Sequence, residues 1–307
     1  MSSPAEQLAA SVDDVVEGLR QQEYLADEGL ATAVYLALSL GRPLFLEGEP
    51  GVGKTEVAKA LATWTGGELI RLQCYEGIDA GQAVYEWDYS RQLLHLRTAE
   101  VVGSATADAA DQLESELYSE RFLVRRPLLR AITATEAPAP VLLIDEVDRA
   151  DDEFEAYLLE ILSDYAITVP ELGTFSAELR PIVIITSNRT RDVHDALKRR
   201  CLYHWVEHPD LEREVAIIGL RSEGADETLV RQVARAVAQF RSFGLYKPPG
   251  VAESIDWAAA LGRLGVDSIT ADSVEATLGT VLKYREDQQR VRDHGLEEVV
   301  AKAHGTD

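Results

Sequence analysis

The chain has 307 residues and 46% of them are hydrophobic, enough for packed cores in one large domain or in a large and a small one, so global disorder is excluded. Its 53 acidic residues outweigh 30 Lys and Arg and give a net charge of −23. This charge argues against duplex DNA or an anionic membrane as the main partner, because both bind basic surfaces. We therefore expect no nucleic-acid partner.

The first two thirds of the chain alternate between helical and strand patterns. Apolar spacing predicts helical structure over residues 10–40 and again over residues 55–64, after a glycine-rich turn. Five short apolar runs are predicted as strands, at residues 44–46, 69–74, 141–144, 182–185 and 202–206. Helices are predicted between them at residues 112–133, 151–163 and 192–200. Strands that alternate with helices predict an α/β fold with a parallel sheet covered on both faces.

The character of the sequence changes after residue 208. From there to the end the patterns are helical only, interrupted by glycine and proline at residues 244, 247–250 and 262–265. We therefore predict an α/β domain over residues 1–208 and a smaller all-helical domain over residues 209–307. The stretch at 165–180 predicts a β-hairpin inserted before the fourth strand.

Residues 48–55 read Gly-Glu-Pro-Gly-Val-Gly-Lys-Thr and fit the phosphate-loop pattern G-x-x-x-x-G-K-[ST] at every position. The loop falls between a predicted strand and a predicted helix, as the chemistry requires, whereas a chance glycine-rich turn need not. Its glycines let backbone N–H groups face the phosphates, Lys54 reaches the β- and γ-phosphates, and Thr55 holds Mg²⁺. The predicted nucleotide-binding residues are Gly48, Glu49, Pro50, Gly51, Val52, Gly53, Lys54, Thr55 and Glu56.

The predicted strand at 141–144 ends in two adjacent carboxylates, Asp145 and Glu146. Neighbouring strand residues point to opposite sides, so the two acids can have different roles. We predict that Asp145 binds Mg²⁺ and that Glu146 is the general base that activates water. The alternative, a solvated loop start that caps the next helix, is our interpretation of Asp148, Asp151 and Asp152.

Composition gives no sign of other metal chemistry or of export. Cys74 and Cys201 are far apart and the six histidines are scattered, so neither a disulfide framework nor a zinc site is predicted. The amino-terminal residues lack the features of a secretory signal, and the longest apolar runs are far shorter than a membrane span. We therefore expect a cytoplasmic protein.

Three segments resemble the Walker A, Walker B and sensor 1 elements of AAA+ ATPases: residues 48–55, 142–149 (Leu-Leu-Ile-Asp-Glu-Val-Asp-Arg) and 184–189 (Ile-Ile-Thr-Ser-Asn-Arg). More narrowly, the chain resembles the MoxR family, and within it the branch associated with carbon monoxide dehydrogenase maturation. The segments that carry this narrower resemblance are 42–50, 72–79, 85–89, 126–129, 169–173 and 252–257. The resemblance covers residues 20–290 and implies an AAA+ αβα sandwich with a five-stranded parallel sheet, an inserted segment near 77–105 and a helical lid.

The resemblance also implies roles for single residues. Asn188 matches the sensor 1 position that orients the attacking water, although an Asn after a strand can also form a simple turn. Arg199 and Arg200 lie where such proteins carry an arginine finger that reaches a neighbouring subunit, and the choice between them stays open. A basic helix end is the alternative for this pair. The family often has a sensor 2 arginine at the segment 247–254, where this chain has only Lys247.

Other segments have two interpretations. The aromatic stretch 84–89 and the hairpin around 169–173 could contact a client protein, or the aromatics could pack the insertion onto the core. A basic helix is expected from Arg121, Arg125, Arg126 and Arg130, facing either a neighbouring subunit or solvent. Tyr24 and Leu25 are candidates for the wall of an adenine pocket.

The expected function is ATP hydrolysis with Mg²⁺ as cofactor, in a homo-oligomeric ring that the resemblance implies is a hexamer. The resemblance further implies chaperone-like remodelling of a client metalloenzyme, with a von Willebrand factor A domain protein as a partner. Two alternatives are a DNA-directed AAA+ motor, which the net charge opposes, and a nucleotide-gated scaffold with little turnover. Lys54, Glu146 and Asn188, all present, oppose the scaffold.

Overall fold

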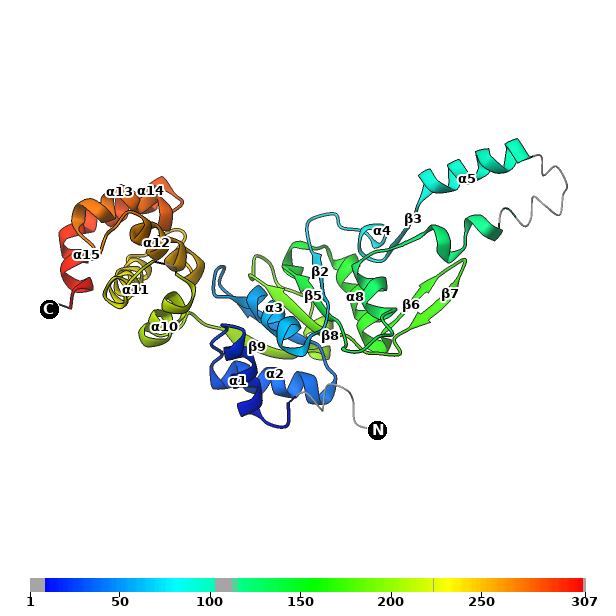
Figure 1. Cartoon of the computed structure of the whole chain (residues 1–307), viewed down its shortest axis with the longest axis horizontal. Helices are drawn as coiled ribbons and strands as arrows, with labels where there is room; N and C mark the ends of the chain where they lie inside the picture. Colours follow the sequence, from blue (N-terminus) through cyan, green and yellow to red (C-terminus); the bar gives the residue numbers. More distant parts are fainter. Residues whose placement is uncertain (1–8, 103–112, 114, 223, 306–307) are drawn as a thin grey trace. The chain divides into compact units, whose positions relative to one another are not determined.

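The computed structural model of the chain describes residues 9–102, 113, 115–222 and 224–305. A five-stranded sheet with the order β2-β5-β8-β1-β9 forms its centre (Figure 1). Its strands are β1 (Leu44–Gly48), β2 (Leu69–Gln73), β5 (Val141–Asp145), β8 (Ile182–Ser187) and β9 (Leu202–Val206). The predicted α/β fold with a five-stranded parallel sheet is therefore confirmed.

Burial along the strands follows their place in the sheet. Every residue of β5 and β8 is buried, and the two strands pair in parallel with Leu142 opposite Val183. Such continuous apolar runs are typical of strands covered on both faces. β2 lies at the end of the strand order and alternates between buried and exposed residues, with Arg71 exposed. An edge strand can therefore carry polar side chains next to the buried end of β5.

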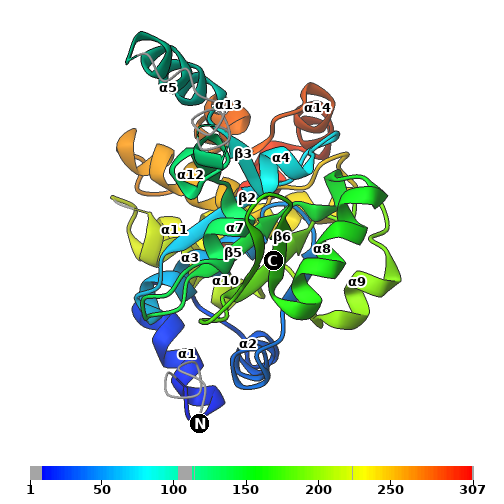
Figure 2. The same ribbon diagram turned by 90° about the vertical axis from the view of Figure 1, so that its right-hand side faces the viewer.

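Helices follow the strands as the sequence patterns indicate. The pattern at 10–40 is divided into α1 (Val12–Gln21) and α2 (Glu28–Leu40), and α3 (Lys54–Thr65) follows the glycine-rich turn. The predicted helices at 151–163 and 192–200 correspond to α8 (Asp152–Asp164) and the shorter α9 (Asp195–Arg200), which lie side by side (Figure 2). Asp151 caps α8 by accepting a hydrogen bond from the Phe154 amide, as predicted from sequence.

The helix predicted over 112–133 is wrong in its middle part. Residues 112 and 114 lie outside the described residues, 113 and 115–117 are helical, and the chain then forms the 3₁₀ turn η2 (Glu120–Phe122) and the strand β4 (Leu123–Arg125) before the short helix α7 (Pro127–Ile132). β4 pairs antiparallel with β3 (Tyr85–Trp87), about 40 residues earlier, with Val124 opposite Glu86. A partner so distant in sequence leaves no local signal.

The expected basic helix is wrong for the same reason. Arg121 lies in η2, Arg125 in β4, and Arg126 caps α7, in which Arg130 lies. Three of these arginines form ion pairs: Arg125 with Glu120, Arg126 with Glu86, and Arg130 with Glu68. They therefore do not form one continuous basic face.

Two further segments project from the sheet. The inserted segment contains α4 (Ala80–Ala83), β3 and α5 (Tyr89–Val102), and the part of the predicted range beyond residue 102 lies outside the described residues. Residues 166–176 form an antiparallel hairpin of β6 (Ala166–Val169) and β7 (Gly173–Ser176). Tyr165, which ends α8 with φ 49°, reverses the chain direction before this hairpin.

The carboxyl-terminal third is helical, as predicted. Its helices are α10 (Leu211–Arg221), α11 (Glu227–Ser242), α12 (Val251–Arg263), α13 (Ala271–Val281), α14 (Arg285–His294) and α15 (Leu296–Ala303). The core of this bundle contains Trp257 and Phe240, whose rings are 5.7 Å apart. The Trp257 indole donates a hydrogen bond to the Thr277 hydroxyl at 2.7 Å, which satisfies its one polar group inside the core.

By internal contacts the chain divides into two compact units. Unit 1 contains Met1–Val15, Ala31–Leu46 and Leu61–His204, and unit 2 contains Val16–Leu30, Glu47–Ala60 and Trp205–Asp307. The phosphate loop thus belongs to the same unit as the carboxyl-terminal helices. In the parts of the chain that the structure describes, no helix combines the length and apolar character needed to cross a bilayer.

Candidate active site

The phosphate loop, residues 48–55 in unit 2, has a backbone that only its glycines allow. Gly51 and Gly53 have φ angles of +82° and +93°, in the left-handed region that side chains disfavour. A Cβ at Gly48 would stand 2.4 Å from the Val206 carbonyl oxygen, so the end of β1 also requires glycine. The loop runs directly into α3, whose first amides have no acceptor within the helix and are suited to an anion.

Lys54 is the first residue of α3 and is 5% exposed. Its ammonium group donates hydrogen bonds to the carbonyl oxygens of Gly48 at 2.8 Å and Glu49 at 2.7 Å. The cation is therefore folded back into the loop. A bound phosphate would compete with these carbonyl oxygens for the three donor positions of the ammonium group.

The segment with Tyr24 and Leu25 lies beside this loop in unit 2. The Tyr24 ring is 3.8 Å from the point where a Cβ on Gly53 would lie, and the ring is buried. Arg213 of α10 donates to the Leu25 carbonyl oxygen at 2.7 Å and to Asp27 at 2.8 Å. Burial raises the pKa of Tyr24 well above its ordinary value, against the opposing charge of Arg213, so the phenol is neutral. Sequence reasoning missed Arg213, which fixes this segment.

The acidic strand end lies in unit 1. Asp145, the last residue of β5, is 2% exposed. One carboxylate oxygen accepts from the Thr186 hydroxyl at 2.6 Å, and the other accepts from the Arg71 guanidinium, whose Nε lies at 3.0 Å. Carboxylate oxygens are ligands that Mg²⁺ takes, so the side-chain type fits the metal role, and a metal would compete with Arg71 and Thr186 for these oxygens.

Glu146 follows with a φ of 55°, a strained left-handed conformation for a residue with a side chain. Its backbone amide donates to Thr186 Oγ1 at 2.9 Å. One carboxylate oxygen accepts from Asn188 Nδ2 at 3.2 Å, and the other accepts from Gln73 Nε2 and from Arg149, each at 3.1 Å. The structure therefore brings together the predicted general base and the predicted sensor 1 residue.

Asp148 is not the solvated residue that its sequence context suggested. It is 2% exposed and accepts from the Asn188 amide at 3.1 Å, the Thr190 amide at 2.8 Å and the Thr190 hydroxyl at 2.6 Å. Burial alone would raise the pKa of Asp148, but the hydrogen bonds from Thr190 and Asn188 outweigh it and hold this pKa below its ordinary value. Asp148 thus fixes the turn that carries Asn188, whereas Asp152 is 86% exposed.

Arg199 and Arg200 form the last turn of α9. Both are exposed, with the Arg199 side chain 83% accessible and 3.9 Å from Asp195, so the structure does not choose between them. The Arg42 guanidinium donates to the carbonyl oxygens of Arg199 and Arg200, each at 3.0 Å. Arg42 therefore caps the carboxyl end of α9 and fixes the backbone from which both arginines extend.

Lys247 lies in the turn before α12. Its backbone amide donates to Asp287 at 3.0 Å, and its side chain is exposed. The segment 247–254 itself contains no arginine.

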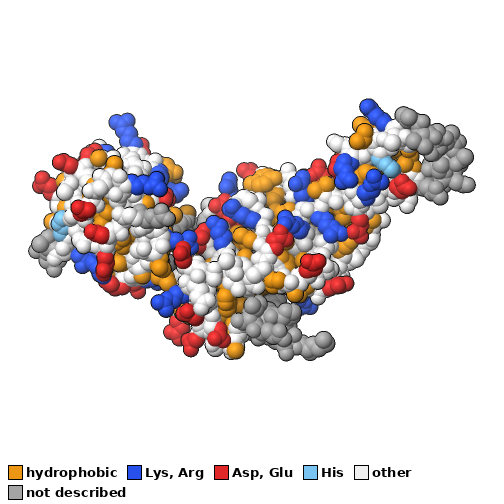
Figure 3. All heavy atoms as spheres, in the orientation of Figure 1, with side chains coloured by type: hydrophobic (Ala, Val, Ile, Leu, Met, Phe, Trp, Pro, Cys, Tyr) orange, Lys and Arg blue, Asp and Glu red, His pale blue; other side chains and the backbone are white. Residues whose placement is uncertain are grey.

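In the aromatic stretch at 84–89, some side chains pack onto the core and others are exposed for contact with a client. Trp87 is 6% exposed and packs edge-on against Tyr118 with ring centres 5.4 Å apart, so it belongs to the core of the insertion. Tyr89 is 67% exposed at the start of α5, and Leu93 and Leu94 of the same helix are 52% and 66% exposed. Figure 3 shows hydrophobic and basic side chains together on α5. This helix face is available for contact with another protein.

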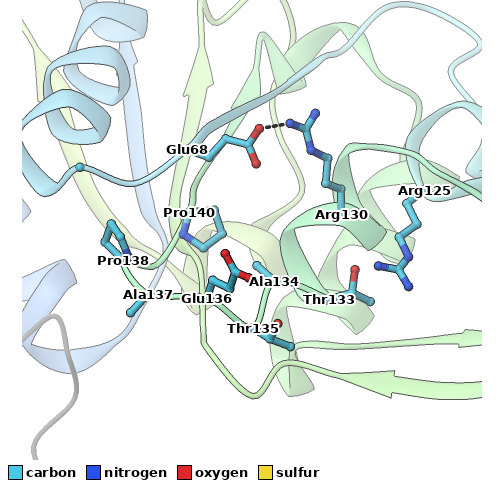
Figure 4. Close-up of a pocket in the computed structure, with 11 residues that line it drawn as sticks. Glu68, Arg125, Arg130, Thr133, Ala134, Thr135, Glu136, Ala137, Pro138 and Pro140 are labelled. Carbon is cyan, nitrogen blue, oxygen red and sulfur yellow. Dashed lines mark hydrogen bonds and ion pairs between the residues drawn. The ribbon is translucent and has the colours of Figure 1, made fainter.

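A cavity of about 450 Å³ lies at the opposite, amino-terminal ends of β2 and β5. Figure 4 shows Glu68 and Arg130 joined by an ion pair on one wall, with Arg125 and Glu136 on others. Two glutamates and two arginines lie around it, and its lining includes none of the residues that the sequence singled out for catalysis.

Sequence reasoning missed the residues that support the strand-end carboxylates. Arg71 and Gln73 alternate along β2 and contact Asp145 and Glu146, while Thr186 lies on β8. Their only sequence signal is a polar side chain near the end of a strand. That signal becomes useful once the order β2-β5-β8 is known.

Comparison with known proteins agrees with this geometry. The family described as AAA domain (dynein-related subfamily) matches residues 43–201, which is more than half of the chain. A relative in Escherichia coli (strain K12), the uncharacterized protein YehL, is 25% identical over 295 residues, covering 84% of this chain and 74% of the relative.

Two solved structures are also similar to this chain. A RuvB mutant of Thermotoga maritima has a TM-score of 0.46 and 16% identity, covering 88% of this chain and 71% of that one. A proposed ATPase from Cytophaga hutchinsonii has a TM-score of 0.45 and 13% identity, covering 97% and 96%.

Proposed function

Because the chain belongs to the AAA domain family, in its dynein-related subfamily, we propose that it is an ATPase that uses Mg²⁺ and acts as a remodelling machine. The observation that carries the proposal is the hydrogen bond between Glu146 and Asn188 at 3.2 Å, where the ends of β5 and β8 place a carboxylate and an amide together. A phosphate loop that fits its pattern at every position supplies the nucleotide-binding half.

In this proposal the roles divide between the two groups of residues. Lys54 and the amides of residues 48–56 bind the phosphates, while Thr55 and Asp145 would hold Mg²⁺. When bound with ATP, the metal supplies positive charge to the phosphate oxygens. Glu146 accepts the proton of the attacking water. The Asn188 side-chain amide, which donates to Glu146, orients that water.

Three contacts fix the Glu146 carboxylate in the structure: Gln73, Arg149 and Asn188. An ionised carboxylate has about four acceptor positions, so three donors leave room for the attacking water beside the Asn188 contact. Arg149 is 55% exposed, and its ion pair with Glu146 contributes little.

We further propose that the active unit is a homo-oligomeric ring, with a hexamer as the expected number, in which Arg199 or Arg200 reaches the nucleotide of a neighbouring subunit. The resemblance to the MoxR family supports a chaperone-like role toward a client metalloenzyme, with a von Willebrand factor A domain protein as partner. The exposed face of α5, with Tyr89, Leu93 and Leu94, is the surface we assign to the client.

Two other functions fit less well. A DNA-directed motor would need a basic surface, whereas Arg125, Arg126 and Arg130 pair with glutamates in a chain of net charge −23. A scaffold that binds ATP without turnover would not need the Glu146–Asn188 pair or the buried Asp148 that fixes it.

The proposal is tested by phosphate release from the purified chain with ATP, with and without a chelator of divalent cations. We expect turnover that requires Mg²⁺. Affinity capture with Glu146→Gln in the presence of ATP should retain a client protein, and the same capture with Lys54→Ala should not. Phosphate release that continues in the chelator, or no release at any concentration of protein, would contradict the ATPase assignment.

A further inference from the structure

Gly250, directly before α12, lies in backbone contact with Gly51 of the phosphate loop. The Val251 amide donates a hydrogen bond to the Gly51 carbonyl oxygen at 3.0 Å. A Cβ on Gly250 would stand 2.7 Å from the Gly51 Cα, and a Cβ on Gly51 would stand 2.9 Å from the Gly250 Cα. Neither position has room for a side chain while this contact exists.

The glycine at 250 is explained by this contact and not by its backbone conformation. Gly250 has φ −83° and ψ −177°, an extended conformation that any residue adopts. Gly51 differs, because its φ of +82° calls for glycine in any case. Close approach to the phosphate loop is therefore the reason for glycine at this helix start.

A buried network holds residues 249–251 in place. The Glu253 carboxylate accepts from the Gly250 amide at 3.0 Å, and Ser254 Oγ donates to Glu214 at 2.8 Å. Arg241 forms a two-point ion pair with the same Glu214, at 2.6 and 2.8 Å, and donates from Nε to the Pro249 carbonyl oxygen at 2.8 Å. Since Glu214 is 1% exposed and fully paired, this anchor is rigid.

The carboxyl-terminal part of unit 2 also contacts both ends of the phosphate loop through side chains. His208 lies 3.0 Å from Glu49, and Arg221 lies 3.8 Å from Glu56. These are exposed contacts of small energetic weight. The Gly51–Gly250 contact differs because a shift of the Gly51 peptide by one ångström would either break its hydrogen bond or push α12.

We propose that the Gly51–Gly250 contact transmits the state of the phosphate loop to the carboxyl-terminal helices, so that ATP binding is sensed through the backbone. The inference rests on the proposed ATPase function. A bound phosphate would accept from the amides of the loop and compete for Lys54, which donates to the carbonyl oxygens of Gly48 and Glu49. A shift of the Gly51 peptide on binding would act directly on the amide of Val251, and no arginine in the segment 247–254 is needed.

The test uses Val251→Pro with Val251→Ala as its matched control. Proline is well tolerated at the first position of a helix, and here it breaks the contact twice, since the amide donor is lost and the ring Cδ takes its place against the Gly51 carbonyl oxygen. Alanine keeps the amide and shortens the same side chain. The readout is the ATP-dependent change in amide hydrogen exchange of helices α12 and α13. We expect this change in the wild-type chain and in Val251→Ala, and at least a fivefold smaller change in Val251→Pro.

ATP binding separates this inference from the proposed function. Loss of one hydrogen bond should weaken ATP binding of Val251→Pro by no more than about tenfold relative to Val251→Ala. If the wild-type chain binds no ATP, the proposed function fails. If it binds ATP and Val251→Pro keeps the full exchange response, the backbone contact does not transmit the signal.

A second pair covers the case in which proline disturbs folding. Gly250→Ala inserts a Cβ into the contact, and Gly219→Ala in α10 adds one where nothing lies within 4 Å. We expect Gly250→Ala to lose the exchange response while Gly219→Ala retains it, each measured well below its own unfolding temperature. Equal responses in the two variants would overturn the inference.

Discussion

The two catalytic regions of this molecule are held by different kinds of interaction. At the strand ends of unit 1, side chains position side chains: Thr186 and Arg71 on Asp145, and Gln73 and Asn188 on Glu146. In the phosphate loop of unit 2, the contacts are made to the backbone: the Lys54 ammonium donates to loop carbonyl oxygens, and Gly250 lies against Gly51. The loop thus offers amides and one cation to a ligand, whereas the strand ends hold two carboxylates in place.

The largest effect should come from the loop. Lys54→Ala should abolish ATP binding, because the phosphates lose a positioned cation in a protein of net charge −23. Lys59→Ala is the matched control, since Lys59 lies on the same helix but pairs with Glu56 at the surface. Calorimetric titration should show no ATP binding for the first variant and near wild-type affinity for the second. Unchanged ATP affinity in Lys54→Ala would contradict the assignment of this loop as the phosphate-binding site.

The next largest effect should come from the arginine that we propose reaches the nucleotide of a neighbouring subunit. Replacing the true finger, Arg199 or Arg200, by alanine should remove roughly 10³-fold of turnover and leave ATP binding intact. The other arginine then serves as its control, because both extend from the same turn of α9.

Mixed assemblies make this prediction sharper. Combining the inactive finger variant with Lys54→Ala should restore part of the activity, since an intact loop in one subunit can then face an intact arginine in another. Absence of activity at every ratio, while mixed assemblies demonstrably form, would mean that the arginine does not act between subunits.

A smaller effect, on the free energy of unfolding, tests the strand ends of unit 1. Asp148→Asn should lower the free energy of unfolding by about 2–3 kcal/mol at neutral pH, because an amide replaces an ionised acceptor of three hydrogen bonds. Asp151→Asn, which keeps a good helix cap, should change it by less than about 0.5 kcal/mol. Denaturant titration measures both, and equal stabilities would show that Asp148 does not hold the turn.

The same pair has a pH dependence with a defined sign. The pKa of Asp148 is lower in the folded chain than in the unfolded one, so its contribution is present above the unfolded value and is lost as pH falls through the folded value. The stability difference between wild type and Asp148→Asn should therefore shrink below about pH 4. A difference that stays constant down to pH 2 would contradict this origin.

The smallest effect uses a probe built into the strand ends. Burial, with the nearby charge of Asp145 adding to it, raises the pKa of Cys74 to about 12, and burial raises that of Cys201 to the same value. Neither thiol should react with iodoacetamide at pH 8 in the folded protein, while both should react in denaturant. Mass spectrometry counts the added groups, and rapid native labelling of Cys74 would indicate that the strand-end region opens.

The sequence was sufficient where chemistry depends on residue type at a strand end. Glu146 was predicted because a carboxylate follows an apolar run after a phosphate loop, and Asn188 because the segment 184–189 resembles the sensor 1 element. Asp148 was misjudged because its partner Thr190 lies after a different strand, and β4 was missed because it pairs with β3 across a long insertion. Arg71 depends on strand order, which local patterns do not contain.

Backbone contacts were the hardest to foresee. Gly250 has an ordinary extended conformation, and its sequence context, Pro-Pro-Gly, is typical of a simple turn. Only the folded chain shows that Gly51 occupies the space of a side chain at this position. A motif records which side chains a site needs, whereas a contact between two glycines leaves no residue type that points to the other partner.

The most direct test of the account compares ATP binding and hydrolysis in Glu146→Gln. We expect this variant to bind Mg²⁺-ATP with wild-type affinity, because the phosphate loop is intact. It should hydrolyse ATP at least ~100-fold more slowly, because the general base is lost. Calorimetry and single-turnover phosphate release on the same preparation give both numbers. Hydrolysis within threefold of the wild-type rate would contradict the assignment of Glu146 and, with it, the division of the site into a loop that binds and strand ends that react.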